Sequence, residues 1–295
     1  MAYLNYFLFR GINFLIGLMP FGLIHLFSNL VAFFLHRVFK YRLPVIKRNL
    51  EFIKPNASEA ERASIISQFY GNLADLFLES IKGNSMSAKQ ILRRYVYKNP
   101  DLIEAVYAKH QSIILAPGHY NNWEWAAVTL SYISDFKLVA MYKQLSNSYI
   151  DSYIRRNRSR KGFLMVPLHE TNKTFKDHQG IKTMFGLVGD QSPSSIKKAI
   201  WIKFFDQDTA CLHGIESYSS SNNYPILFAF PKRVGRSRYE IEFEILIEEP
   251  QNYSKGEITK IYMKRLETLI RKDPENWILS HKRWKHKLDG SKVTR

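Results

Sequence analysis

The sequence has a single cysteine, Cys211, in 295 residues, and it lacks the motifs of several large enzyme classes. One thiol excludes an internal disulfide framework, which favours a reducing compartment. A lone thiol without a neighbouring catalytic motif also predicts an inert side chain rather than a nucleophile. No G-x-G-x-x-G, G-x-x-x-x-G-K-[ST], paired C-x-x-C or H-E-x-x-H string occurs. Nucleotide-binding and zinc-dependent functions therefore lack their usual sequence anchors.

Acidic residues are also scarce. There are 26 Asp and Glu against 43 Lys and Arg, which gives a net charge of +17. Such an excess predicts a polyanionic partner: nucleic acid, an anionic membrane surface, or an acidic carrier or substrate. The chain also contains 20 Phe and 17 Tyr, and apolar side chains are concentrated in its opening segment. This distribution favours the membrane.

No charged residue occurs from Gly11 to Leu35, a length that is sufficient to cross a bilayer. Pro20 and several polar side chains interrupt this run, so two short helices lying in the membrane interface fit it equally well. A buried helix of a soluble protein is the alternative. Basic residues then accumulate from Arg37 to Arg48, and by the positive-inside rule the rest of the chain lies in the cytoplasm.

Short apolar runs alternate with helical segments from Ser112 onward, which predicts an α/β fold. Because the first four runs are apolar almost throughout, they are typical of parallel strands buried on both faces. A later run, Arg238 to Glu248, alternates and predicts a half-exposed strand toward a sheet edge. We expect a single domain with a mixed, largely parallel central sheet flanked by helices. The predicted strands are 112–117, 137–142, 162–167, 183–188, 225–230 and 238–248.

Helix signals lie between and before these strands. Ser58 and Glu61 form a capping-box pattern, and Ile65, Phe69, Leu73 and Phe77 follow at helical spacing. This pattern predicts a helix with one buried face. Further helices are expected in the ranges 85–110, 123–132, 146–160 and 255–271.

The most informative segment is IILAPGHYNNWEWAA, residues 113 to 127, which reads as a buried strand, a Pro-Gly turn and the start of a helix. Ligands of α/β sheets bind beyond the carboxyl ends of strands, where His119 and Glu124 lie. If Glu124 accepts a proton from one imidazole nitrogen, the other nitrogen is free to take one, as a general base must. The His-x4-Glu spacing alone also fits a structural histidine.

The string GHYNNWE, residues 118 to 124, resembles the His-x4-Asp/Glu signature of the glycerolipid and lysophospholipid acyltransferase superfamily. It is most similar to the bacterial lipid A late acyltransferase branch, although Asn121 stands where that branch usually has Gly. Three further blocks match in order, and Lys143 stands where Arg is usual. Four ordered blocks from about residue 48 onward are more specific than one motif. The matching positions outside the first block are Tyr142, Lys143, Asn147, Arg158, Arg160, Gly162, Gly189, Asp190, Gln191, Ser192, Phe204, Phe205, Thr209, Trp277, His281 and Arg283.

The resemblance implies transfer of a fatty acyl group from a thioester donor, acyl carrier protein or CoA, to a hydroxyl of a lipid A precursor or related glycolipid. It implies His119 as the general base assisted by Glu124, with no cofactor and no metal. Residues 1–40 would be the membrane-associating segment and residues 41–295 the acyltransferase domain, at the cytoplasmic face of the bacterial inner membrane. The partners would be the donor, the lipid acceptor and an anionic membrane surface, without specific nucleic acid.

Five further residues are predicted to bind substrate: Asn122, Lys143, Arg158, Asp190 and Gln191. Charge-assisted contacts from Lys143 and Arg158, and from Arg160 beside them, suit a phosphorylated headgroup or an acidic carrier. A solvated basic helix face is the alternative for these residues. Asp190 and Gln191 fit a structural turn as well. Glu216 is a candidate for a second acid near the site.

Three other functions fit parts of the sequence. Another polar lipid, such as an aminolipid or a lysophospholipid, could be the acceptor, because acceptor choice depends on pocket shape. A non-catalytic basic protein that binds membranes or nucleic acid would explain the charge. A thioesterase would use the same histidine and pass the acyl group to water.

Overall fold

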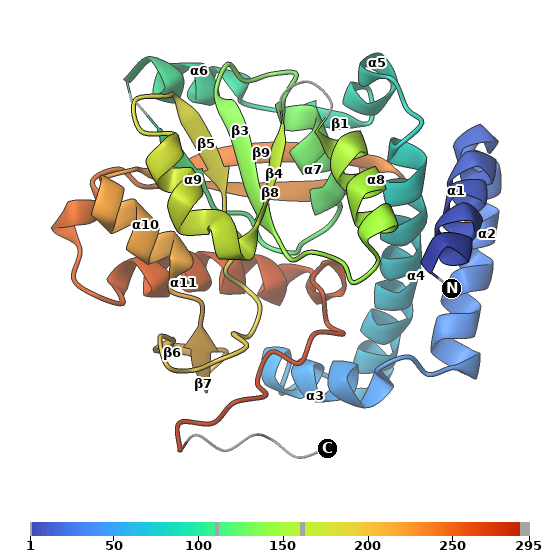
Figure 1. The fold of residues 1–295 in the computed structure, drawn as a ribbon. Helices are drawn as coiled ribbons and strands as arrows, with labels where there is room; N and C mark the ends of the chain where they lie inside the picture. The colour runs from blue at the N-terminus through green and yellow to red at the C-terminus, as the bar shows by residue number, and fades with distance from the viewer. Residues whose placement is uncertain (1, 110–111, 160–162, 290–295) are drawn as a thin grey trace.

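The computed structural model describes residues 2–109, 112–159 and 163–289, which form a central sheet with helices on both sides (Figure 1). Seven strands make up this sheet in the order β1-β9-β8-β2-β5-β3-β4. All neighbouring pairs are parallel except β8 and β9. The predicted mixed, largely parallel sheet with flanking helices is thus confirmed. The strands are β1 Tyr95–Tyr97, β2 Ile113–Leu115, β3 Lys137–Tyr142, β4 Leu164–Pro167, β5 Thr183–Gly186, β8 Ile226–Gly235 and β9 Arg238–Ile247.

Strand side chains alternate between two hydrophobic clusters, one on each face of the sheet. In β2, Ile114 belongs to one cluster, whereas Ile113 and Leu115 belong to the other. Successive side chains of a strand point to opposite faces, so apolar residues at every position are needed where helices cover both faces. The first cluster lies under α9 Thr171–Asp177, α10 Gly214–Asn222 and α11 Glu257–Lys272, and the second under α5 Ala88–Leu92, α6 Pro100–Lys109 and α7 Trp123–Leu130.

The N-terminal part of the chain forms two helices, α1 Ala2–Leu18 and α2 Phe21–Phe33, which lie beside the long helix α4 Glu59–Gly83 (Figure 1). Of the alternatives that the sequence left open, the break at Pro20 agrees with two short helices, since proline lacks the N–H that a helix interior needs. A π-helical turn, Phe34–Val38, extends α2, and α3 Leu43–Ile53 leads to α4. Within the described residues, Phe21–Val38 is a stretch long and apolar enough to cross a membrane, and only 11% of it is buried.

Helix α4 begins as predicted, because the Ser58 side chain accepts a hydrogen bond from the Glu61 N–H at 3.2 Å. Its predicted buried face is wrong at the far end: Ile65 and Phe69 are buried, but Phe77 is 60% exposed. Each step of four residues advances about 40° beyond a full helical turn. Over 25 residues this drift moves the face that began against the core toward α1 and the surface.

Three strands were not predicted. β1 is only three residues long and lies between two helices, and β6 Ile200–Phe204 and β7 Gln207–Cys211 form a separate antiparallel hairpin. The turn of this hairpin places Phe205 and Asp206 at φ angles of 51° and 60°, without the Asn-Gly or Asp-Gly pair that usually identifies such turns. β9, predicted toward an edge, is the second strand of the sheet because β1 pairs with its outer side.

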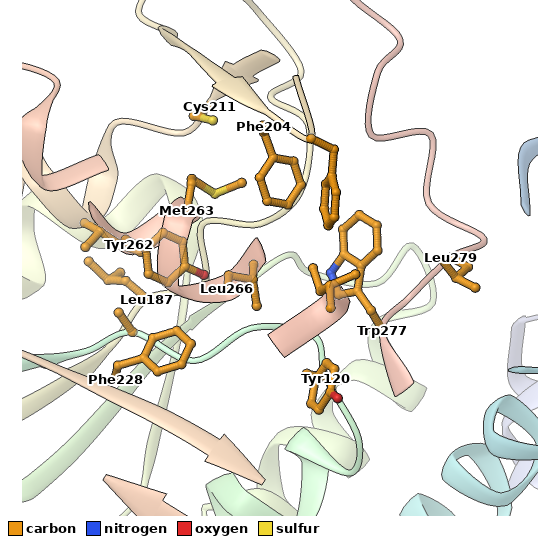
Figure 2. Packing of buried hydrophobic residues seen from close by; sticks show 14 of the residues in the cluster. Tyr120, Leu187, Phe204, Cys211, Phe228, Tyr262, Met263, Leu266, Trp277 and Leu279 are labelled. Carbon is orange, nitrogen blue, oxygen red and sulfur yellow. The ribbon is translucent and has the colours of Figure 1, made fainter. Parts of the chain in front are cut away.

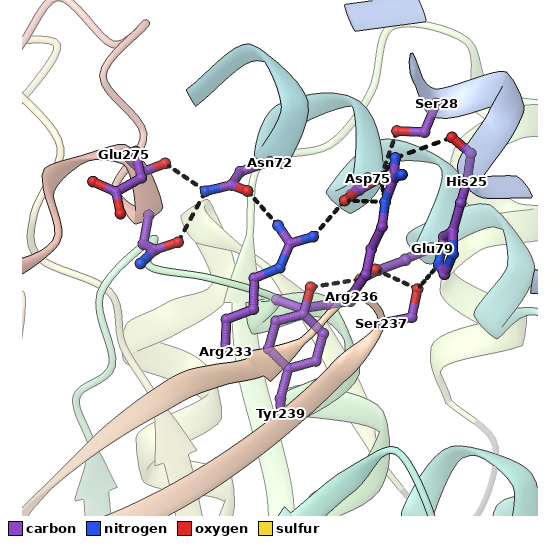
Figure 3. Close-up of polar contacts among 12 residues, drawn as sticks. His25, Ser28, Asn72, Asp75, Glu79, Arg233, Arg236, Ser237, Tyr239 and Glu275 are labelled. Carbon is purple, nitrogen blue, oxygen red and sulfur yellow. Dashed lines mark hydrogen bonds and ion pairs between the residues drawn. The ribbon is translucent and has the colours of Figure 1, made fainter. Parts of the chain in front are cut away.

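A buried ionic network joins α2 and α4 to the β8–β9 hairpin (Figure 3). Asp75 on α4 accepts hydrogen bonds from Arg233 at 2.5 Å, from Arg236 at 2.7 Å and from Ser28 on α2 at 2.5 Å. Burial would raise the pKa of Asp75, but the bonds from Arg236, Ser28 and Arg233 outweigh it and lower that pKa. The network therefore fixes α2 against the rest of the protein with a fully engaged carboxylate.

Replacing Asp75 by alanine is expected to lower the free energy of unfolding by more than about 1 kcal/mol, because two partly buried guanidinium groups lose the buried carboxylate that neutralises them. Chemical denaturation in detergent, monitored by tryptophan fluorescence, measures this loss. The matched control is Asp208→Ala, which removes an exposed ion pair with Lys203 and should change stability by no more than about 1 kcal/mol. Equal effects of the two substitutions would contradict a stabilising role for the network.

Candidate active site

The loop after β2 and the loop after β5 meet because these two strands are parallel neighbours. Their carboxyl ends lie at the same edge of the sheet, so Gly118 and His119 of the first loop face Asp190 of the second. Gly118 permits this approach, since a Cβ at that position would lie 2.7 Å from Leu266 Cδ1. Leu266 belongs to the buried cluster that supports both loops from below (Figure 2).

The imidazole of His119 is held by Asp190. His119 Nδ1 lies 2.6 Å from Asp190 Oδ1, and the His119 backbone N–H donates to Asp190 Oδ2 at 2.8 Å. An ionised carboxylate only accepts, so Nδ1 carries the proton and Nε2 keeps its lone pair. This tautomer is the one that a general base acting through Nε2 requires.

Asp190 is itself fixed by the C-terminal segment. Its side chain is 0% exposed, and Trp277 Nε1 donates to Oδ2 at 2.9 Å. The backbone of the same segment pairs with the first loop, through Asn121 N–H to Asn276 O at 2.8 Å and Ile278 N–H to His119 O at 3.2 Å. Figure 2 shows Trp277 beside the core that packs under this loop. The histidine and its carboxylate are therefore held by three separate segments of the chain.

The two groups shift each other's proton affinity. Burial alone would lower the pKa of His119, but the negative charge of Asp190 and its hydrogen bond outweigh it and raise that pKa above the usual value of 6.5. Burial would raise the pKa of Asp190, yet His119 and the Trp277 hydrogen bond lower it to about 2. Asp190 is thus ionised at neutral pH and stabilises the imidazolium that forms when His119 takes a proton.

The loop that carries Asp190 is held by a second histidine. The Ser192 N–H donates to His281 Nε2 at 2.9 Å, which requires a neutral imidazole. Burial lowers the pKa of His281 to about 4, so this acceptor stays neutral at physiological pH. The sequence placed His281 and Trp277 in a matching block and gave neither a catalytic role, with contact to membrane phosphates as one interpretation of His281. Their contacts instead position Asp190 and its loop.

The sequence predicted that Glu124 contacts the imidazole, and this prediction is wrong. Glu124 forms an ion pair with Arg158 on α8 Ser148–Arg158, and Asp190, at Nδ1, takes the place beside the imidazole that was predicted for Glu124. Glu124 lies in the first turn of α7, one step along a helix that leads away from the loop. Its negative charge also raises the pKa of His119, but by less than Asp190 does.

An apolar cavity of about 400 Å³ opens at His119. It extends between α7 and the face of the sheet, and its polar lining is confined to a few side chains. His119, Glu124, Lys143, Arg158 and Gln191 are among them. Most of the remaining wall is apolar and includes Leu115, Leu130, Leu138, Val139, Ala140, Met141, Phe163, Met165, Met184, Leu187, Ile241 and Phe243.

The predicted substrate-binding residues divide into two groups. Lys143, Arg158 and Gln191 line the cavity, and Gln191 Nε2 lies 3.4 Å from His119 Nε2. Asn122 and Asp190 lie behind it at 0% exposure. Asn122 caps α7 by accepting from the Trp125 N–H at 2.9 Å and donates to Glu79 at 2.7 Å. The structure gives these two residues positioning contacts in place of the predicted substrate contacts.

Two other candidates, Glu216 and Cys211, lie elsewhere. A third, Arg160, lies outside the described residues. Glu216 accepts from the Gly256 and Thr259 backbone N–H groups at 2.6 and 2.9 Å, so it caps the start of α11 and is no second acid at the site. Cys211 is buried, and burial raises the pKa of its thiol, as expected of an inert side chain.

Metal ligands are not grouped in the part of the chain that the structure describes: no three His, Cys, Asp or Glu side chains lie close enough together to hold an ion. The carboxylate next to His119 is already engaged by an imidazole, a backbone N–H and an indole. The arrangement suits proton transfer at Nε2 beside an apolar cavity.

Comparison with known proteins connects this geometry to a family. The family model of the bacterial lipid A biosynthesis acyltransferase matches residues 1–286. The matched range contains the N-terminal helices, the His119 loop, the Asp190 loop and the C-terminal segment with Trp277. No curated protein matches the chain.

Proposed function

The chain belongs to the bacterial lipid A biosynthesis acyltransferase family and is an acyltransferase, and from this premise we propose that it transfers a fatty acyl group from a thioester donor to a hydroxyl of a lipid A precursor. The observation that carries the proposal is the His119–Asp190 pair at the opening of an apolar cavity. It unites a proton acceptor with a site that suits an alkyl chain.

The reaction needs no covalent enzyme intermediate, because a thioester is already activated. His119 Nε2 takes the proton of the acceptor hydroxyl while the hydroxyl oxygen attacks the thioester carbonyl carbon. The tetrahedral intermediate then expels the carrier thiolate, which receives the proton from the imidazolium. Asp190 keeps Nδ1 protonated and stabilises the positive charge during this cycle.

In this proposal Glu124 assists by positioning Arg158, and it makes no hydrogen bond to His119. It fixes the Arg158 guanidinium at the cavity wall, where its planar donors suit a phosphate of the donor or the acceptor. Lys143 provides a second cation on the same wall. The acyl carrier protein and CoA both carry the thioester at the far end of a phosphopantetheine arm, away from its phosphate, so these groups do not discriminate between the two donors.

The presence of two cavities supports separate binding sites for the acyl donor and the lipid acceptor. The first, at His119, would hold the donor acyl chain. A second cavity of about 340 Å³ lies between α1, α4, α7 and α8, and both are lined by Trp123, Glu124 and Arg158. Its wall includes Phe9 on α1 and the exposed Phe77 on α4. We assign it to the lipid acceptor, which would reach the histidine from the side of the N-terminal helices.

Membrane association is proposed for residues 1–40, with residues 41–295 as the acyltransferase domain. Large apolar side chains on α1 and α2 face outward, among them Leu4, Phe7, Leu8, Phe14, Leu15, Leu18, Leu26 and Phe33. An exposed surface of this size marks an interaction site. Basic residues that follow it, from Arg37 to Arg48, suit the cytoplasmic face of the bacterial inner membrane.

The direct test supplies the purified protein in membranes with acyl carrier thioesters and lipid A precursor, and analyses the lipids by mass spectrometry. One added acyl chain on the precursor supports the proposal. An acylated aminolipid or phospholipid would instead identify another acceptor, and free fatty acid in the absence of acceptor would identify a thioesterase. No turnover of any thioester would leave a basic binding protein as the function.

Ala140→Leu is expected to shift the donor preference toward shorter acyl chains. Ala140 lines the cavity from β3, so a larger side chain there removes volume from the space assigned to the chain. Each displaced methylene loses about 0.8 kcal/mol of burial, or about fourfold in relative kcat/KM for the longer donor. Competition between two donors of different length measures the ratio. The control, Ala105→Leu on the exposed side of α6, should leave it unchanged; an unchanged ratio in Ala140→Leu would contradict the assignment.

A further inference from the structure

A third cavity, of about 580 Å³, lies away from the histidine, where α1 gives way to α2. Met19, Pro20 and Phe21 at the break form one wall. The end of α4, helix α5, the segment before β1 and the first residue of β9 form the others. In Figure 1 this region lies at the α5 end of the N-terminal helices. Neither the proposed donor site nor the proposed acceptor site includes these residues.

Four cations surround this cavity: Lys82, Arg93, Arg94 and Arg238. In the described ranges, none of the four forms an ion pair with a carboxylate, whereas nearby Arg233 and Arg236 both pair with Asp75. Cations brought together repel one another; the charge of Glu79 offsets this repulsion in part at Arg94, and a bound anion would offset more of it. Burial and the neighbouring Arg94 accordingly lower the pKa of Lys82.

Two of the cations are held in place. Lys82 Nζ donates to Gly17 O at 2.5 Å, and the Arg94 guanidinium lies 3.5 Å from the centroid of the Phe21 ring. Arg93 and Arg238 are exposed at the rim. The site therefore has an ordered inner part with fixed donors and an outer part open to a ligand, which reduces the entropy lost on binding.

The surroundings of the cavity are apolar. Leu15 and Leu18 at the end of α1 and Leu23 at the start of α2 are 58%, 69% and 45% exposed. Met19 and Phe21 continue this surface into the cavity. Basic groups beside an exposed apolar helix pair are the combination that binds anionic lipid, with the phosphate among the cations and the acyl chains along the helices.

We propose that this cavity binds the phosphate headgroup of an anionic membrane phospholipid. A free phosphate shares the charge but would gain nothing from the apolar wall. An acidic protein would need a broader surface than a concave pocket at a helix break. The inference rests on the proposed membrane association, and it adds a specific anchor that holds the α1–α2 break at the headgroup level while the two cavities near His119 stay available for the reaction.

The test compares the full-length protein with the double variant Arg93→Gln/Arg238→Gln in flotation assays. Vesicles of phosphatidylcholine alone are compared with vesicles that also contain phosphatidylglycerol. Because each cation near an anionic surface contributes about fivefold to partitioning, the double variant should bind the anionic vesicles about thirtyfold less tightly. Binding to neutral vesicles should not change.

The matched control is Lys260→Gln/Lys272→Gln, which removes two exposed cations from α11 on the opposite face of the sheet. It should change anionic-vesicle binding by less than about twofold. An equal loss in both double variants would assign the effect to net charge and overturn the site. If Arg93→Gln/Arg238→Gln bound vesicles normally but bound acyl carrier protein less tightly, the result would overturn the headgroup site in favour of a site for the acidic carrier. A further measurement asks whether inorganic phosphate alone raises the melting temperature of the unsubstituted protein but not that of Arg93→Gln/Arg238→Gln. If it does, and vesicle binding is the same for both proteins, this result would overturn the headgroup site in favour of a free-phosphate site.

The His119→Gln variant separates this inference from the catalytic proposal. It should bind anionic vesicles like the unsubstituted protein while it loses acyl transfer. Retained transfer in His119→Gln would refute the catalytic proposal and leave the headgroup site standing, whereas normal vesicle binding by Arg93→Gln/Arg238→Gln would refute the headgroup site alone.

Discussion

The His119→Ala variant is expected to lower kcat for acyl transfer by about 10²- to 10⁴-fold, the usual contribution of a positioned general base. The imidazole is partly exposed at the cavity, and its Nε2 is the proton acceptor of the proposed reaction. Because the donor chain binds elsewhere in the cavity, KM for the donor should change little. Steady-state kinetics with an acyl carrier thioester and a lipid A precursor measure both constants.

The control for this variant is His169→Ala, which removes a histidine whose side chain is 71% exposed and lies outside the cavity lining. It should keep full activity. Circular dichroism and vesicle binding should be the same for both variants, which separates lost chemistry from lost folding. Full activity in His119→Ala would end the proposal that this imidazole is the base.

The Asp190→Asn variant is expected to lose about 10²- to 10⁴-fold in kcat, because the carboxylate that holds the His119 tautomer and stabilises the imidazolium is gone. The residue touches no substrate in this proposal and acts as a positioning residue. Asn keeps the size of the side chain, so the fold should be retained. Thermal unfolding checks this retention, with the exposed Asp208→Asn as the control.

The pH profile distinguishes this role from a merely structural one. A protonated His119 cannot accept a proton, so kcat/KM of the unsubstituted protein should fall as the pH drops through a His119 pKa above 6.5. Asp190 raises that pKa, and without its charge the pKa must fall. The acid limb of Asp190→Asn should therefore move to lower pH while its plateau is reduced. A reduced plateau with an unmoved limb would indicate that Asp190 only supports the fold.

The comparison of sequence and structure is clearest at the histidine. The strand-turn-helix pattern of residues 113–127 predicted that His119 lies beyond the end of a buried strand, and it does. The same pattern suggested Glu124 as the partner of the imidazole, because Glu124 is near in the sequence. The partner is Asp190, 71 residues away, brought there by the pairing of β2 with β5. Only the order of strands in the sheet decides which carboxylate meets the imidazole.

The predicted substrate-binding residues show the same limit of sequence-based prediction: their contacts depend on the tertiary structure. The charge of Arg158 marked it as a candidate, but its ion pair with Glu124 depends on how α8 packs beside α7. Asn122 and Asp190 share the motif blocks with residues that line the cavity, yet both lie behind the loop, and the protein engages every polar atom of their side chains. A motif indicates the chemistry that a segment can perform, whereas packing decides which of its side chains face the cavity.

The sequence by itself determined the class of the fold, the proline break in the apolar N-terminal segment and the strand end that carries His119. Each of these is encoded in hydrophobic periodicity or turn chemistry over a few neighbouring residues. The tertiary structure alone decided the His119–Asp190 pair, the Glu124–Arg158 pair and the four cations gathered at the helix break. These groups come from segments far apart in the chain, and their meeting depends on strand order and helix packing, which no local pattern records.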